Sequence, residues 1–360
     1  MIELQTVWGW QPALYLFLGG MGGGAFVMAA LLVFVDKPNS ERTVAVSMWA
    51  AVICLVAGLL CLLTELTNPL RGLLLWQSFS NYSSWMTFGA WMVFAAVVVF
   101  GLAAVVATDA TAALVGRAWK GFSSRRAGLL KALSGLGLVL GACVAMYTGV
   151  LLMSAPGVPL WNTFLLPCLF TVSAFDTGIA LVEIVLAVQA KRERLSRKAH
   201  TLMNVLVVVL VVVELVVLTA LLLTMSGGNG AAEGSGVAAA AMQSAALVVS
   251  GQLAPFFWVL VVACGLLLPL LMAIAGLMAK PKGPNVAADA KAAPDAVVVE
   301  SVPAHPLPAE KASKASIIGA TGALVGGCAL RFLVIMAGIH ADVVADATAQ
   351  IFADMLARLG

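Results

Sequence analysis

The chain has 360 residues, of which 62% are hydrophobic and only 10% are charged, and its mean hydropathy is +1.04. These values lie far outside the range of soluble domains and exclude a soluble enzyme. The charged side chains gather in short stretches between apolar runs of about 20 residues, which predicts an all-α, polytopic membrane protein. The formal net charge of +3 does not indicate nucleic-acid binding, because here the position of each basic residue is what matters.

Each long apolar run is interpreted as a spanning helix, since backbone groups in hydrocarbon must satisfy their own hydrogen bonds. In chain order the predicted cores are 12–35, 44–63, 85–107, 129–153, 160–189, 201–225, 250–278 and 316–338. The seventh has an alternative, because Pro255 could divide the uncharged run between Glu233 and Lys280 into two shorter helices.

The distribution of basic residues favours eight helices with the N-terminus outside. All of the 20 Lys and Arg residues except Arg71, Arg331 and Arg358 then fall on the inner side, as the positive-inside rule requires. Both termini are expected to be extracytoplasmic, in a bacterial cytoplasmic (inner) membrane. Residues 1–11 contain Glu3 but no Lys or Arg, so we expect no cleaved signal peptide.

The resulting division of the sequence has four parts. Residues 1–279 hold the first seven helices, and residues 316–339 hold the eighth. The stretch 280–315, rich in Ala, Pro, Val and Lys, is predicted to be a flexible cytoplasmic linker. Residues 340–360 space apolar side chains at helical intervals and are predicted to form an amphipathic tail at the outer surface.

Ligands for a metal or haem inside the membrane are scarce. Of the three histidines, His305 lies in the predicted linker, and His200 and His340 lie at opposite ends of the membrane. A transmembrane b-type haem held by two facing histidines is therefore not expected. The six cysteines include no C-x-x-C pair, so we also expect no iron–sulfur cluster or other metal in this protein.

Ionisable residues inside spanning helices are costly and are candidates for function. The sequence places six of them in or near the membrane: Glu65, Asp109, Asp176, Glu183, Glu214 and Arg331. Asp109 is interpreted as an interfacial residue. Asp176 and Glu183 are two helical turns apart and share one face, about 10 Å apart along the axis. With Glu214 they fit a proton path, but hydrogen bonding within the bundle or pairing with Arg331 would explain them equally well.

A second group of polar residues is predicted near the outer face. It comprises Tyr15, Glu65, Arg71, Tyr147, Trp161, Asn162 and Arg331. A carboxylate and a phenol beside an apolar cavity could accept protons from, and form hydrogen bonds with, a quinol head group. In the first helix, Gly20 and Gly23 would let a flat ring or a neighbouring helix approach the backbone, with helix packing the more common explanation.

Several segments in this order resemble the NrfD/PsrC family, the membrane subunits of polysulfide-reductase-type complexes. They are Trp8 to Gly24, Glu65 to Arg71, Ser84 to Trp91, Tyr147 to Leu152, Pro156 to Pro167 and the Gly-Gly…Arg-Phe segment around Arg331. The resemblance implies two four-helix bundles, no haem in this subunit, and a menaquinone or ubiquinone site near the outer face. By position, Tyr147 matches the tyrosine that contacts quinone in the family, and Glu65 lies where the family often has Asp. The family's first-helix histidine has no counterpart here, so Tyr15 or a backbone group would take its place.

The resemblance also implies the partners: an extracytoplasmic, ferredoxin-like iron–sulfur subunit with four clusters and, through it, a molybdopterin or multihaem catalytic subunit. We therefore expect a membrane anchor that oxidises quinol, or reduces quinone, within a respiratory complex and is not an enzyme alone. Glu65 would accept protons, Tyr147 would bind the head group, and Arg71 and Arg331 would balance charge or face the partner. Two other classes remain, a secondary transporter and a passive membrane anchor, although no inverted repeat of the kind found in transporters is visible.

Overall fold

The computed structural model describes most of the membrane region. The described residues are 8–36, 39–65, 85–155, 157–189, 195–232, 234–278 and 314–341, together with the single positions 348, 351 and 355. Arg71, the predicted linker up to residue 313 and almost all of the predicted tail lie outside them.

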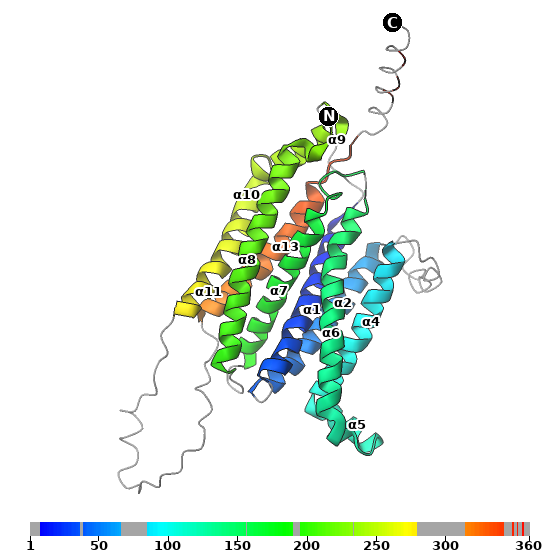
Figure 1. Ribbon diagram of the computed structural model, residues 1–360, viewed down its shortest axis with the longest axis vertical. Coiled ribbons are helices and arrows are strands. Elements are labelled where there is room, and N and C mark those ends of the chain that lie inside the picture. Colours follow the sequence, from blue (N-terminus) through cyan, green and yellow to red (C-terminus); the bar gives the residue numbers. More distant parts are fainter. Residues whose placement is uncertain are drawn as a thin grey trace.

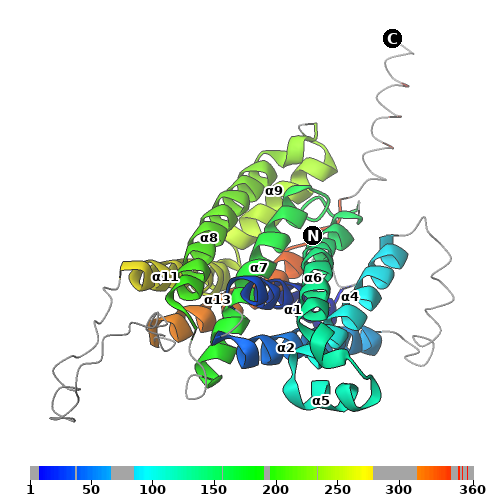
Figure 2. The ribbon, with the colours of Figure 1, turned by 60° about the horizontal axis from the view of Figure 1, so that its bottom comes forward.

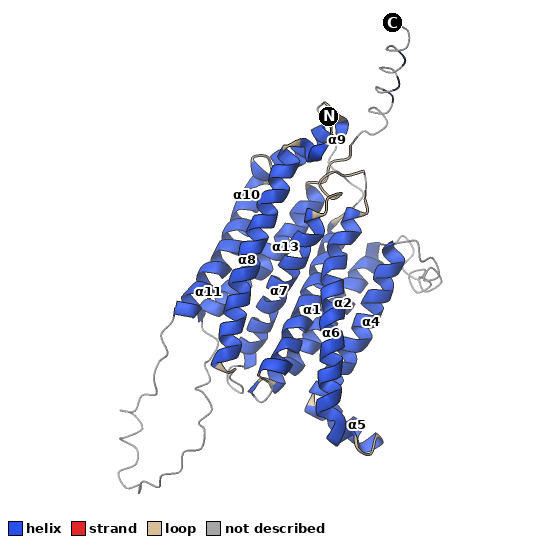
Figure 3. Ribbon diagram, viewed as in Figure 1, coloured by secondary structure: helices blue, strands red, loops and turns tan. Residues whose placement is uncertain are grey.

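The described residues are helical, with short connecting loops and no β-strand among them (Figure 3). Among these described residues, eight helical segments are long and apolar enough to cross a membrane, which confirms the predicted all-α polytopic fold. They are α1 (Trp10–Val35), α2 (Glu41–Glu65), α4 (Trp85–Ala107), α6 (Phe122–Met153), α7 (Leu165–Gln189), α8 (Arg197–Ser226), the continuous α10 (Ala254–Phe256), η4 (Phe257–Leu267) and α11 (Leu268–Met278), and α13 (Lys314–Met336).

The uncharged run before Lys280 is divided into two helices just ahead of Pro255, as the alternative allowed, but only the second is long enough to span, so the count of eight stands. The first, α9 (Gly236–Val249), has 14 residues and is too short to span. The backbone turns between them at Ser250 to Leu253, ahead of Pro255, and the Trp258 indole donates a hydrogen bond to Val249 O at 3.0 Å. The middle of the span, η4, is wound as a π-helix over 11 residues.

Three predicted boundaries differ from the structure. The seventh span begins at Ala254 and not at 250, because residues 250–253 form a turn. Helix α6 begins at Phe122 and not near residue 129, because Arg126 donates hydrogen bonds to the carbonyls of Val106 and Ala107 at 2.9 Å each. These carbonyls belong to the last turn of α4, and carbonyl groups in that position have no hydrogen-bond donor within their own helix. Helix α7 begins at Leu165 and not at 160, since residues 157–164 form turns. A short helix that the sequence reading missed, α5 (Asp109–Ala118), lies between α4 and α6.

Helix α1 lies at the centre of the molecule (Figure 1). It packs against α2 and α6 on one side and equally closely against α7 on the other, with a smaller contact to α13. Helices α2, α4 and α6 pack together on one side of α1, and α7, α8, η4–α11 and α13 pack together on the other, but α6 also packs directly against α7. We call the end of the bundle at which α1 begins and α13 ends the upper end, and the opposite end the lower end; Figure 2 views the bundle from the lower side.

Glycines allow α1 to approach its neighbours backbone to backbone. A Cβ atom added at Gly23 would lie 2.7 Å from Gly141 O on α6. On the opposite side, a Cβ at Gly24 would overlap the Ala174 carbonyl of α7, and one at Gly178 would overlap the Gly24 backbone. Small residues of this kind are what hold helices together where lipid offers no hydrophobic driving force.

The lower end is tied by a buried carboxylate. Asp36, which follows α1, accepts hydrogen bonds from the Asn39 amide at 2.9 Å and from the backbone N–H of Ser196 at 2.7 Å. Ser196 is the N-cap of α8, so one residue joins the end of α1 to the start of α8.

The close contact of α1 and α7 predicts that Gly24→Ala destabilises the protein, because the added methyl group meets backbone atoms that cannot move aside. We expect a loss of roughly 1–3 kcal/mol, as for other overpacked interiors. Gly135→Ala on α6 is the matched control, since nothing lies within 4 Å of a Cβ there. Thermal unfolding of the purified protein in detergent measures both variants, and equal midpoints for the two would contradict the proposed contact.

Candidate functional site

Two buried groups, one on each side of α1, contain five of the predicted polar residues, Tyr15, Tyr147, Asp176, Glu214 and Arg331. We call Tyr15 and Tyr147 the tyrosine pair, and Arg331 with Ser173, Asp176 and Glu214 the arginine cluster. The tyrosine pair lies among α1, α2, α4 and α6. The arginine cluster lies among α7, α8 and α13.

The tyrosine pair brings together phenols from helices distant in sequence. Tyr15 on α1 and Tyr147 on α6 retain only 7% and 6% of their exposure, and they lie close enough to interact electrostatically. Neither hydroxyl has a hydrogen-bond partner among the described residues. Two phenolic hydroxyls are thus available as hydrogen-bond donors in an otherwise apolar interior.

Each tyrosine packs against a glycine. A Cβ at Gly89 on α4 would overlap the Tyr147 ring, so only glycine allows this ring position. A Cβ at Gly58 on α2 would lie 3.5 Å from the Tyr15 ring. Glu65 is two turns beyond Gly58 and therefore on the same face of α2, about 10 Å nearer the upper end. The backbone of Glu65 belongs to α2, but its side chain is outside the described part of the structure.

Arg331 is completely buried. Its Nη1 donates hydrogen bonds to Ser173 Oγ at 2.5 Å and to Gly327 O at 2.9 Å, and its Nη2 donates to Phe170 O at 3.2 Å. The guanidinium carbon lies 5.0 Å from the centre of the Phe170 ring, a cation–π contact. A Cβ at Gly20 of α1 would lie 3.7 Å from Nη2, so α1 forms one wall of this site.

Two carboxyl groups lie near Arg331 without touching it. Asp176 and Glu214 are each 3% exposed and lie within electrostatic range of Arg331. Among the described residues, neither carboxylate forms a direct ion pair with Arg331. The ion pair that the structure does contain there, Arg126–Asp109 at 2.8 Å, lies at the lower end. The Ser173 hydroxyl, which accepts from Arg331, also lies close to the Glu214 carboxyl. Asp176 Oδ1 and Arg331 Nε have no hydrogen-bond partner there, which is uncommon for buried polar atoms.

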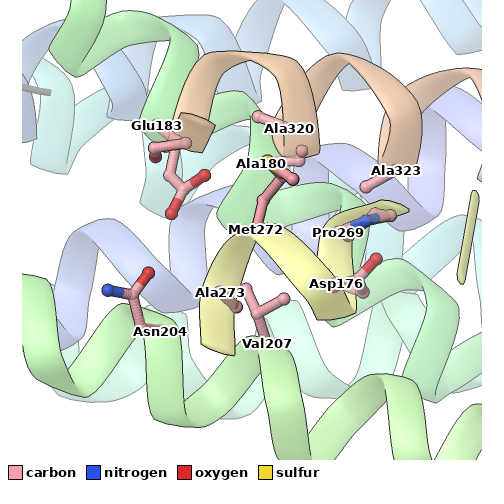
Figure 4. A pocket seen from close by; sticks show the side chains of 12 residues that line it. Asp176, Ala180, Glu183, Asn204, Val207, Pro269, Met272, Ala273, Ala320 and Ala323 are labelled. Atoms are coloured by element: carbon pink, nitrogen blue, oxygen red, sulfur yellow. The ribbon is translucent and has the colours of Figure 1, made fainter. Parts of the chain in front are cut away.

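Glu183 extends the line of acids toward the lower end. It is 8% exposed and lies close to Ser316 on α13, which lines the same cavity. Between Glu183 and Asp176 lies a small cavity of about 10 Å³, also lined by Asn204 of α8 and Met272 of α11 (Figure 4). This is about the space that one water molecule occupies. The structure therefore brings the three predicted proton-path acids to one side of the bundle.

The remaining predicted site residues lie elsewhere. Gly20 faces Arg331 and Ala174, and Gly23 faces α6, so both are occupied by helix packing. Trp161 is buried and donates a hydrogen bond from its indole to Val334 O at 2.8 Å, whereas the exposed Asn162 donates to Met153 O at 2.8 Å. These two side chains fix the loop between α6 and α7. The last predicted site residue, Arg331, is separated from the tyrosine pair by α1.

Sequence reasoning missed several residues that complete these groups. Ser173 was detectable, because it precedes Asp176 by three positions and so shares its face of α7. Gly89 and Gly58 were not, since nothing in the sequence shows which ring packs on which glycine. Asn204 and Ser316 are polar residues near helix ends, where the sequence alone does not separate them from interfacial residues.

The family described as "Polysulphide reductase, NrfD" matches residues 3–283 of this protein. Among curated proteins, the sequence is similar to the C subunit of the polysulfide reductase of Wolinella succinogenes, with 30% identity over 184 residues. That alignment covers 49% of this sequence and 56% of the relative, so the match spans about half the length of the curated relative.

The arginine cluster predicts a strong coupling between Arg331 and Glu214. Arg331→Met leaves two buried carboxyl groups without a nearby positive charge, and we expect a loss of roughly 3–5 kcal/mol of stability. Adding Glu214→Gln should recover part of that loss, because the second change removes one of the stranded charges. A double-mutant cycle by thermal unfolding in detergent measures the coupling.

Arg125→Met, which removes an exposed basic residue of α6, is the control for loss of positive charge alone. Its unfolding midpoint should stay within the range of ordinary surface substitutions. Strictly additive effects of the Arg331 and Glu214 substitutions would show that the two side chains do not interact.

Proposed function

Because the protein belongs to the NrfD family of polysulphide reductase membrane proteins, we propose that it is the quinone-reactive membrane subunit of a respiratory oxidoreductase. In this proposal quinol binds near the upper end of the bundle beside the tyrosine pair. The observation that carries the proposal is a pair of buried phenols, held on glycine faces in an apolar interior, with no hydrogen-bond partner among the described residues.

The proposed site fits the chemistry of a quinol head group. A quinol ring is flat, apolar on its faces and carries two oxygen atoms that form hydrogen bonds, so phenol donors and close backbone approach suit it. Tyr147 would bind one ring oxygen, and Tyr15 would take the place of a donor that the first helix otherwise lacks. Glu65, on the same face of α2 as Gly58, would accept a proton.

Oxidation of one quinol gives one quinone, two protons and two electrons. The protons would leave through Glu65 toward the upper side, and the electrons would pass to an iron–sulfur subunit docked at the upper end. We expect that subunit to be ferredoxin-like with four clusters and to deliver electrons to a molybdopterin or multihaem catalytic subunit. With the opposite driving force the same residues would serve quinone reduction, with proton uptake in place of release.

The proposed orientation puts the upper end outside the cytoplasmic membrane and both termini on that side. Support comes from the described basic residues at the lower end, among them Arg117, Lys120 and Arg125 beside α5 and Arg197 and Lys198 at the start of α8. Positive residues are retained on the cytoplasmic side.

Arg331 and the acids would serve a separate step, the movement of protons on the far side of α1. In sequence from the upper end, the groups are Arg331 with Ser173, then Asp176 and Glu214, then the cavity, then Glu183. Spacing of this kind suits proton transfer through side chains and intervening water. Arg331 would hold the charge of the acids in balance and would not touch the quinol head group.

The proposed site predicts that Tyr147→Phe and Glu65→Gln each slow quinol-dependent electron transfer. For Glu65→Gln the expected loss is roughly 10²–10⁴-fold, which is the usual cost of removing a proton-transfer group. Neither change should dissociate the complex, since the helices stay packed. Turnover of reconstituted complex with a reduced quinone analogue is the measurement, and undiminished turnover in both variants would refute the site. A passive anchor would show changed assembly with normal turnover.

Displacing the ring without removing its hydroxyl provides a sharper test of position. Gly89→Ala should force the Tyr147 ring away and lower turnover. Gly101→Ala on the same helix, where nothing lies within 4 Å of a Cβ, should leave turnover unchanged. Equal turnover of the two glycine variants would place the reacting ring away from Tyr147.

The line of acids predicts that Asp176→Asn alters proton movement more than electron transfer. Proton uptake and release by complex in liposomes, followed with a pH-sensitive dye, should fall while quinol oxidation by detergent-solubilised complex continues. Asp109→Asn, a change at an acid that is 78% exposed, is the matched control and should have no effect. If Asp176→Asn leaves proton uptake and release unchanged, the proton path is wrong.

A further inference from the structure

A second cavity opens at the lower end of the bundle, opposite to the tyrosine pair. It lies between the ends of α1 and α4 and the starts of α2 and α6, and its volume is about 160 Å³. Val33, Val44 and Leu130 give it an apolar floor, whereas Glu41, Ser123 and Arg126 give it a polar rim. We call it the lower-end pocket; nothing in the proposed quinone chemistry uses it.

We propose that the lower-end pocket binds an anionic phospholipid with a glycerol headgroup, as in phosphatidylglycerol. The phosphate would lie at Ser123 and Arg126, the free glycerol hydroxyl would donate a hydrogen bond to Glu41, and the acyl chain would lie along the apolar floor. The mixture of one cation, one carboxylate and an apolar floor matches this order of groups. A bare phosphate would leave Glu41 facing another acceptor, so the headgroup must also carry a donor.

Arg126 is fixed in position for this role. Its Nε donates to Val106 O at 2.9 Å, and its Nη2 donates to Ala107 O at 2.9 Å and to Asp109 at 2.8 Å. The third nitrogen, Nη1, has no partner among the described residues, and the side chain keeps 33% of its exposure. A guanidinium whose plane is already held loses little entropy when it binds phosphate through its free edge.

The surroundings favour an anionic over a zwitterionic lipid. Four exposed basic residues stand on the helices that form the rim or on the segment just before α6: Arg42 on α2, Arg125 on α6, Arg117 on α5 and Lys120 in the turn after α5. Asp109, the exposed acid of α5, is paired with Arg126. Clustered basic residues beside a pocket between spanning helices attract anionic headgroups.

Helix α5 places the pocket at headgroup depth. It lies across the lower end beside α6 (Figures 1 and 2). Leu114 on α5 is 61% exposed and Trp119 directly after it is 45% exposed. An exposed tryptophan and leucine beside exposed Arg and Lys are typical of a segment that lies in the membrane interface.

The test uses the full-length protein in its purified complex and measures retained phosphatidylglycerol by native mass spectrometry. Ala127→Phe fills the pocket from its wall without changing any charge, and bound phosphatidylglycerol should be lost. Ala132→Phe is the matched control, because Ala132 is also exposed on α6 but does not line the pocket, and it should retain the lipid. Equal retention by both variants would overturn the proposal.

Charge and headgroup are tested separately. Neutralising Lys120 and Arg125 with Gln should weaken binding by about fivefold for each residue, whereas Arg197→Gln with Lys198→Gln, at the start of α8, should not weaken it. Phosphatidylethanolamine should fail to compete. Equal binding of phosphatidylethanolamine would overturn the choice of an anionic lipid, and equal binding of free glycerol phosphate would show a soluble-anion site in place of a lipid site.

Discussion

The contact of α1 with α6 and α7 through bare backbone is the constraint on which the other features depend. At Gly23 and Gly24 the neighbouring helices leave no room for a side chain, so α1 is fixed in height and rotation against both. This fixes which residue of α1 faces each side. Gly19 faces Thr148, next to Tyr147, and Gly20 faces Arg331. One helix thus lies between the tyrosine pair and the arginine cluster, and its consecutive residues Gly19 and Gly20 face Thr148 on one side and Arg331 on the other.

The position of α1 between the two groups suggests how the proposed electron and proton steps would be linked. A shift of α1 by a fraction of its rise would change the packing at Thr148 and at Arg331 together, because tightly packed interiors have no slack to absorb it. The arginine cluster is suited to respond, since its charges meet through Ser173 and leave Asp176 Oδ1 and Arg331 Nε unpaired. A direct salt bridge between Arg331 and an acid would fix these side chains more firmly than their present arrangement, in which two polar atoms have no partner among the described residues.

The helices themselves could be predicted, because hydrocarbon allows a spanning segment few alternatives and the charges mark the loops. Prediction failed where a side chain acted outside its own helix. Arg126 caps the carbonyls of α4 and so extends α6 back to Phe122, and nothing in the local sequence shows where those carbonyls lie. The turns at residues 157–164 likewise depend on Trp161 reaching Val334, far away in the sequence. Both errors come from contacts between residues far apart in sequence.

For the candidate site, the sequence by itself determined which residues carry chemistry, because an acid, an arginine or a glycine in an apolar helix stands out against its surroundings. It also determined that Asp176 and Glu183 share a face, since helical periodicity alone requires this. Only the tertiary structure decided the grouping: Tyr147 lies on Gly89 and beside Tyr15, whereas Arg331 lies with Ser173 and the acids across α1. The physical reason is that helix rotation and height are set by backbone contacts at glycines, and a sequence names the glycines without naming the partner that each one admits.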